Sequence, residues 1–89
     1  MTAQASAINV TSTGQVVTGG CSYRGLSIGS TAGAAVVVYD GTSASGTVLA
    51  SFTLAANGFQ DISVPDGVRC SVGIYLTASA AIQGHVRVG

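Results

Sequence analysis

The segment Thr47–Leu54, TVLASFTL, alternates apolar and polar side chains along its length. In an extended chain, one side carries Val48, Ala50, Phe52 and Leu54, and the other carries Thr47, Ser51 and Thr53. A repeat of two residues is typical of a β-strand that packs one face against a core. This segment therefore predicts a strand with one buried face and one exposed face.

Similar short segments extend in both directions from this strand. Breaks of Gly, Asn, Asp and Pro separate them at steps of roughly 8–12 residues, which is typical of a sandwich or barrel. The other predicted strands are 7–11, 15–18, 21–28, 34–39, 59–64, 68–76 and 82–88. No stretch repeats with the period of an α-helix. The chain thus predicts one all-β domain over residues 1–89, a small antiparallel β-sandwich of about seven or eight short strands, Ig-like or jelly-roll-like, with essentially no helix.

The same pattern predicts which residues form the core and where the chain turns. Ala34–Tyr39 (AAVVVY) is a continuous apolar run, so we expect a central strand buried on both faces or nearly so. Pro65-Asp66-Gly67 is expected to form a tight turn, because Pro presets its first central position. The expected inward rows are Val68, Cys70, Val72, Ile74 and Leu76; Ile82, Val86 and Val88; Ile8 and Val10; and Leu26 and Ile28.

The chain is very poor in charge. Its six charged residues sum to zero and include no Lys or Glu, whereas about a quarter of the residues of a soluble domain are usually charged. A net charge near zero favours association, so we expect a protein that is packed against other proteins. Without a basic field we expect no nucleic acid partner. The longest apolar run is too short for a membrane span, and the N-terminus lacks the basic and apolar regions of a signal peptide. We therefore expect no membrane partner.

The two cysteines, Cys21 and Cys70, fall in different predicted strands. Buried thiols and an inter-strand disulfide are both compatible with this placement. Buried thiols are favoured, because the chain has no Trp to pack on a bridge and no visible secretion signal. One His and two distant Cys do not have the spacing of metal ligands, so we expect no metal and no cofactor.

Two sets of residues are candidates for contact with a partner. If 68–76 and 82–88 pair as a hairpin around 78–81, one outward face carries Arg69, Tyr75, Gln83, His85 and Arg87. An ordinary solvated sheet face is an equally good interpretation. Two loops of small residues should lie at opposite ends of the central strand, with candidate contacts Ser30, Thr31, Asp40, Thr42, Ser43 and Ser45. For these loops, simple solvated connections are the favoured interpretation.

The sequence gives little support to catalysis. A Ser nucleophile needs a base and an orienting acid, and nothing in the spacing of His85 and the aspartates indicates such a set. Asp40 and Asp66 each precede Gly, where Asp commonly caps backbone groups of a turn. We therefore expect a protein that is not an enzyme.

Several motifs resemble those of a known group of proteins. The stretches are SYRGLSIG at Ser22–Gly29, VVVYDGTSASGTVLA at Val36–Ala50 and DGVRCSVGIYLTAS at Asp66–Ser79, followed by a final G-x-V-x-V-G at Gly84–Gly89. Their common features are an early YRG element, a YDG turn followed by a small-residue loop and Gly-Thr, and a late G-[IL]-Y strand. With these motifs the chain resembles, over residues 21–89, small β-sandwich virion accessory proteins of tailed bacteriophages.

The resemblance implies a non-enzymatic capsid decoration (cement) or minor capsid protein, located in the virion and assembled in the host cytoplasm. The implied partners are the major capsid protein or another virion protein, together with further copies of this chain, a trimer being favoured. Residues 1–7 are then expected to form an N-terminal arm along a neighbour.

Two other functions remain open at this stage. One is a tail or head-fibre module that recognises host surface carbohydrate through its few exposed aromatic residues. The other is a secreted adhesin or pilus-like subunit, which would need export and a Cys21–Cys70 bridge.

Overall fold

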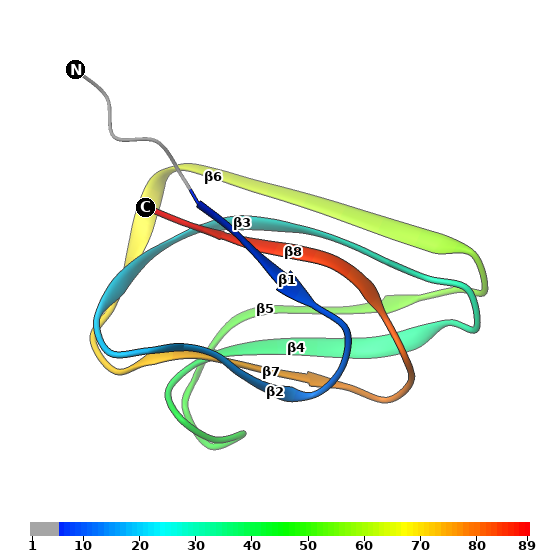
Figure 1. Ribbon diagram of the computed structural model, residues 1–89, viewed down its shortest axis with the longest axis horizontal. Helices are drawn as coiled ribbons and strands as arrows, with labels where there is room; N and C mark the ends of the chain where they lie inside the picture. The colour runs from blue at the N-terminus through cyan, green and yellow to red at the C-terminus, as the bar shows by residue number, and fades with distance from the viewer. Residues whose placement is uncertain (1–5) are drawn as a thin grey trace.

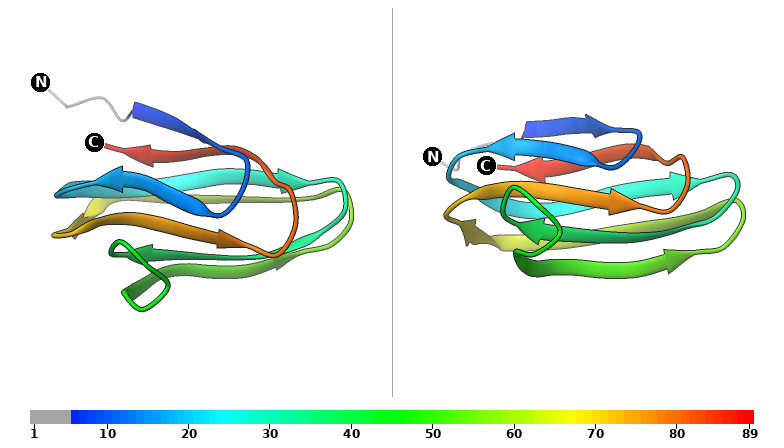
Figure 2. Two further views of the ribbon diagram at one scale, coloured as in Figure 1. Left: turned by 60° about the horizontal axis from the view of Figure 1, so that its bottom comes forward. Right: turned by 90° about the horizontal axis from the view of Figure 1, so that it is seen from below.

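The protein is a sandwich of two four-stranded antiparallel sheets, as a computed structural model describes it for residues 6–89 (Figures 1 and 2). The predicted all-β sandwich is confirmed. The strands are β1 Ser6–Val10, β2 Gly14–Thr18, β3 Cys21–Ser30, β4 Ala34–Asp40, β5 Thr47–Leu54, β6 Gly58–Cys70, β7 Gly73–Ala78 and β8 Gln83–Val88. We call the sheet with strand order β1-β8-β3-β6 sheet A, and the sheet with order β2-β7-β4-β5 sheet B. The described residues contain no helix that could cross a membrane.

The strands pair in a nested order that defines the topology. The innermost pair is β4·β5, and it is followed outward by β3·β6, β2·β7 and β1·β8. Successive pairs alternate between sheet B and sheet A, so one long antiparallel ribbon is rolled over itself. This arrangement is the jelly roll, one of the two topologies that the sequence left open.

The core lies between the two sheets and consists mainly of aliphatic side chains. The largest fully buried residues are Tyr23, Leu26, Ile28, Ile74, Leu76, Val36, Val38, Val86 and Cys70. Compact β-branched residues suit this space, because facing sheets lie only about 10 Å apart. The predicted inward positions of Leu26, Ile28 and Val86 are therefore correct.

Strand β4 is buried on one face only, so the prediction of burial on both faces is wrong. Ala34, Val36 and Val38 point into the core, whereas Ala35 is exposed and Val37 is half-buried. The strand lies inside sheet B, between β7 and β5, but no further strand of the described residues packs on the outer side of that sheet, where only the loop at 41–46 lies over one end (Figure 2).

The predicted turn at 65–67 is also wrong, because β6 continues through it. Ser63 pairs with Gly25 and Val68 pairs with Tyr23, so residues 64–67 together oppose Arg24 alone. The turn-forming residues therefore make a bulge in an edge strand, where a Pro without an N–H is tolerated. The chain reverses direction later, at residues 71–72.

This late reversal breaks the inward row predicted for 68–76. Val68 and Val72 are 41% and 48% exposed, whereas Cys70, Ile74 and Leu76 are buried. The hairpin predicted between 68–76 and 82–88 does not exist either. Strand β7 pairs with β2 and β4 in sheet B, and β8 pairs with β1 and β3 in sheet A. The connection between β7 and β8 crosses from one sheet to the other.

A second bulge changes the orientation of β5. Ala50 pairs with Val38 and Val48 with Tyr39, which leaves Leu49 as an extra residue. Phe52 and Leu54 face inward as predicted, but Val48 is turned outward and is 54% exposed.

The predicted N-terminal arm overlaps the first strand. Ser6 and Ala7 belong to β1 and pair with Val88 and Arg87 of β8. Residues 1–5 of the predicted arm lie outside the described residues.

Candidate functional site

The few charges of the protein are distributed unequally between the two sheets. Five of the six belong to strands of sheet A, namely Arg24, Asp61, Asp66, Arg69 and Arg87. The sixth, Asp40, ends β4 in sheet B, and its carboxylate accepts hydrogen bonds from the backbone N–H groups of residues 71–73 at 3.2–3.4 Å. The two outer faces of the sandwich therefore differ in chemistry, and each is a candidate binding surface.

The outer face of sheet B carries no charged side chain. Gln15, Tyr75, Tyr39 and Val48 form one row across β2, β7, β4 and β5. Thr77, Val37 and Ser51 form the next row across β7, β4 and β5. We call these seven residues the tyrosine face. Tyr39 and Tyr75 lie directly opposite each other on neighbouring strands, which brings two aromatic rings to the middle of an uncharged surface.

The outer face of sheet A carries a polar row instead. Asn9, His85, Ser27 and Asp61 lie side by side across β1, β8, β3 and β6. The Ser27 hydroxyl donates a hydrogen bond to Oδ1 of Asp61 at 2.5 Å. We call these four residues, together with Arg87, the polar row.

Arg87 connects the members of the polar row to the backbone of sheet A. Its Nη2 donates to the carbonyl of Ile62 at 2.6 Å and to Oδ1 of Asp61 at 3.3 Å. Its Nη1 donates to the Ser27 hydroxyl at 3.1 Å and to Nε2 of His85 at 3.2 Å. The guanidinium thus has partners inside the fold for most of its donors, which leaves little of it to bind a ligand.

The hydrogen bonds of the polar row determine which of its groups donate and which accept. Because an Arg can only donate, Nε2 of His85 is the acceptor in its contact with Arg87. The hydrogen bonds from Ser27 and then Arg87 lower the pKa of the Asp61 carboxyl. Ser27 therefore donates to a carboxylate, and no hydrogen bond among residues 6–89 joins its hydroxyl to His85 as a base. This geometry favours structural positioning over nucleophilic chemistry.

The predicted contact face is divided between the two sides of the molecule. Gln83, His85 and Arg87 lie on β8, and Arg69 lies on β6, all in sheet A. Tyr75 lies on β7 and belongs to the outer face of sheet B. The five residues therefore cannot form one surface, because the hairpin on which the prediction rested does not exist.

The predicted contact loops lie at opposite ends of β4, as expected. Thr31, Thr42, Ser43 and Ser45 are exposed. Ser30, however, is only 3% exposed, and its hydroxyl donates to the carbonyl of Ala81 at 2.8 Å. Ser30 and Asp40 therefore hold parts of the fold together. For Asp40 the expected capping role is confirmed, although it caps the β6–β7 turn rather than its own.

Cys21 and Cys70 pair directly across β3 and β6, and both are free thiols. Burial is the main cause that raises the pKa of Cys21, and it raises that of Cys70 to about 11. Among residues 6–89, no three His, Cys, Asp or Glu side chains gather closely enough to bind a metal ion.

The tyrosine face and the cysteine pair escaped prediction because both depend on which strands become neighbours. The sequence placed Tyr75 on the outward side of its strand, but the continuous apolar run at 34–39 gave no outward side to Tyr39 and did not show that the two strands would pair. Comparison of the chain with protein-family models, curated proteins and solved structures finds no match.

Proposed function

We propose that this protein is a non-enzymatic structural component of a bacteriophage virion, a capsid decoration (cement) or minor capsid protein that binds the capsid shell and stabilises it. The observation that carries the proposal is the tyrosine face. The centres of protein–protein interfaces are enriched in Tyr and depleted of charge, and this face has that composition. The resemblance to phage accessory proteins supplies the kind of partner.

The proposed attachment uses the outer face of sheet B. Tyr39 and Tyr75 would lie against the major capsid protein or another virion protein, and exposed Val48 would extend the apolar contact. A subunit placed over the junction of two capsid proteins adds contacts that must break before the shell dissociates. Sheet A, with its internally bonded polar row, would face solvent. Several copies are expected to act together, with a trimer favoured.

The jelly-roll topology agrees with this proposal by analogy. Jelly rolls occur in viral capsid proteins, but also in lectins and cupins. Because one fold serves many functions, the topology alone does not choose among them.

Charge insertion on the two faces tests the proposal. Tyr75→Lys and Thr77→Lys place a charge on the tyrosine face, and Gln83→Lys and Ser63→Lys place the same charge on sheet A. The measurement is co-sedimentation of each purified variant with capsids that lack this protein, with circular dichroism as a check on folding.

We expect the sheet B variants to bind at least about tenfold more weakly and the sheet A variants to bind like the original protein. Equal binding by all four variants would show that attachment uses another surface. If the original protein neither binds the capsids nor raises their resistance to heat, the proposed function itself is wrong.

A second candidate function rests on a different surface. Phe59 is 67% exposed on β6 and borders a shallow hollow of about 210 Å³ together with Thr31, Asn57 and Gln83. An aromatic face beside planar amide groups is typical of carbohydrate recognition. A glycan array probed with the original protein and with Phe59→Ala separates the two functions. Saccharide-dependent binding that is lost in Phe59→Ala would favour a tail or head-fibre module.

A further inference from the structure

The two cysteines occupy matched positions at one end of sheet A. Cys21 is the first residue of β3 and Cys70 is the last residue of β6, and the two residues pair directly. The Cα atoms of directly opposed antiparallel residues lie about 4.5–5.5 Å apart, which is within the range that disulfides span. The Cys70 thiol donates a long hydrogen bond to the carbonyl oxygen of Val68 at 3.7 Å, so it is not bonded to Cys21 in the reduced state.

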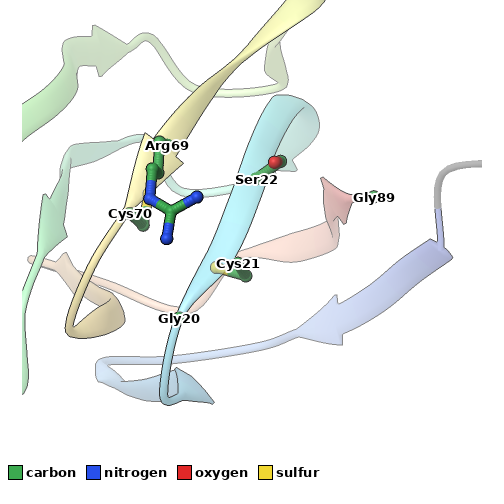
Figure 3. Close-up of a pocket in the computed structure, with 6 residues that line it drawn as sticks. All are labelled: Gly20, Cys21, Ser22, Arg69, Cys70 and Gly89. Atoms are coloured by element: carbon green, nitrogen blue, oxygen red, sulfur yellow. The ribbon is translucent and has the colours of Figure 1, made fainter.

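One member of the pair, Cys21, is accessible from the surface. Both cysteines border a surface hollow of about 250 Å³, whose other walls come from Gly20, Ser22, Arg69 and Gly89 (Figure 3). Cys21 is half-buried, whereas Cys70 has no exposed surface. Cys21 is therefore the cysteine that a reagent in the hollow can reach, and Cys70 is its direct cross-strand neighbour.

We propose that Cys21 and Cys70 form a redox modification site, which a low-molecular-weight disulfide converts into a cross-strand disulfide. The thiolate of Cys21 attacks one sulfur of the small disulfide, which forms a mixed disulfide and releases one small thiolate. The thiolate of Cys70 then attacks the Cys21 sulfur and releases the second. Two protein thiols are oxidised, one small disulfide is reduced to two thiols, and the two protons pass to the leaving thiolates.

The backbone next to the pair can accommodate the bond. Gly19 and Gly20 precede Cys21, and the turn at residues 71–72 follows Cys70. The paired part of β3 and β6 ends at these two cysteines. The two Cβ atoms can therefore move slightly closer without disturbing backbone hydrogen bonds on both sides of the pair. The bond would tie β6, an edge strand of sheet A, to β3. This inference goes beyond the proposed function and does not depend on it.

The surroundings of the two thiols determine the expected rate of thiol–disulfide exchange. Burial raises the pKa of both thiols, that of Cys70 to about 11, and the nearby carboxylate of Asp40 raises both further. The other titratable or charged neighbours are the buried phenol of Tyr23 and the guanidinium of Arg69. Because the thiolate is the reacting species, exchange is expected to be slow at neutral pH and to accelerate with each unit of pH.

The test is incubation of the reduced protein with oxidised glutathione, followed by intact mass spectrometry. We expect a monomer whose mass is lower by two hydrogen atoms and which carries no glutathione. Trypsin cleaves after Arg24, Arg69 and Arg87, so the bond should join peptides 1–24 and 70–87. Dithiothreitol should restore both thiols. The linked protein should melt about 10–20 °C above the reduced protein.

Two variants show which cysteine carries out each of the two exchange steps. Cys70→Ala should stop at the mixed disulfide on Cys21, and Cys21→Ser should react far more slowly because Cys70 is buried. Two outcomes with the original protein would overturn the proposal: both thiols remain free, or a glutathione adduct persists on Cys21. Since the original protein decides the result, a poorly folding variant does not weaken the test.

Discussion

The guanidinium of Arg87 lies across the face of Gly25. These residues pair on β8 and β3, and a Cβ atom at position 25 would approach Nη2 of Arg87 at 3.0 Å and collide with the carbonyl oxygen of Ile62. The same carbonyl accepts the shortest hydrogen bond that Arg87 makes. A bare backbone at position 25 therefore lets Arg87 reach across sheet A to β6.

Gly25→Ala should destabilise the protein by about 3 kcal/mol or more. The substitution adds a backbone collision to a φ of +120° that L-residues rarely adopt. The measurement is the free energy of unfolding in urea. Gly14→Ala is the matched control, because no atom lies within 4 Å of a Cβ at that position. It should leave the stability unchanged or raise it slightly, and an equal loss in both variants would contradict the argument.

Arg87→Lys should lower the free energy of unfolding by about 1–2 kcal/mol. A lysine keeps the charge but cannot serve Ile62, Ser27 and His85 at the same time, because it lacks the planar fork. Arg69→Lys is the control, since Arg69 is exposed and its side chain forms no hydrogen bond or ion pair within residues 6–89. Thermal melts that show the same Tm for both variants would mean that the Arg87 contacts contribute nothing.

Asp40→Ala should destabilise the protein by about 1–2 kcal/mol. Its carboxylate holds the backbone N–H groups of the β6–β7 turn, and removal leaves them without that acceptor. Asp66→Ala, in the exposed bulge of β6, removes the same charge and should have almost no effect. Chemical denaturation of the two variants at one pH compares them directly, and a larger loss in Asp66→Ala would reverse the assignment.

Tyr23→Phe should stabilise the protein by about 1 kcal/mol. The ring of Tyr23 is buried in the core, and its hydroxyl has no hydrogen-bond partner among the described residues. Removing an unpaired buried hydroxyl removes a desolvation penalty. Tyr39→Phe, at the half-buried outer face of sheet B, should change the stability little. A fall in Tm for Tyr23→Phe would reveal a partner for the hydroxyl.

Stability should fall in alkaline solution. Burial raises the pKa of Tyr23 from 10.0 to about 12 and that of Cys70 from 9.0 to about 11. Both groups hold their protons more tightly when folded, so their contribution is complete below pH 9 and is lost as the pH rises through 11 and 12. Urea titrations from pH 8 to 11.5 should show this decline. In the double variant Tyr23→Phe, Cys70→Ala the decline should be smaller, and an unchanged slope would assign it to other groups.

Local patterns in the sequence predicted the positions of most strands. Thr47–Leu54 matches β5 at both ends, because alternation reports which positions contact a core. The same reasoning failed at Pro65–Gly67. These residues satisfy a local turn, but the pairing of β6 with β3 on both sides of them makes the segment a bulge instead. Long-range pairing outweighed local turn preference there.

The candidate surfaces could be predicted only in part. The sequence shows that charge is scarce, but the distribution of that charge between the sheets depends on topology. Tyr75 was assigned to the surface of His85 because neighbouring segments were expected to pair. In a jelly roll, segments that follow each other in the sequence often lie in opposite sheets. Tyr75 therefore lies next to Tyr39 in sheet B, and not beside His85 in sheet A.

The nested pairing of the strands also constrains the order in which this chain can fold. The β4·β5 pair closes a loop of residues 41–46, whereas β1·β8 closes a loop that contains almost the whole domain. The entropic cost of loop closure therefore rises from the innermost pair outward, and the outer pairs are expected to form after the inner ones. Strand β8 lies between β1 and β3, so sheet A cannot be completed on the ribosome until β8 has been synthesised. Until then, β1 and one side of β3 remain unpaired edges, and a chaperone or another nascent copy has its best opportunity to bind them.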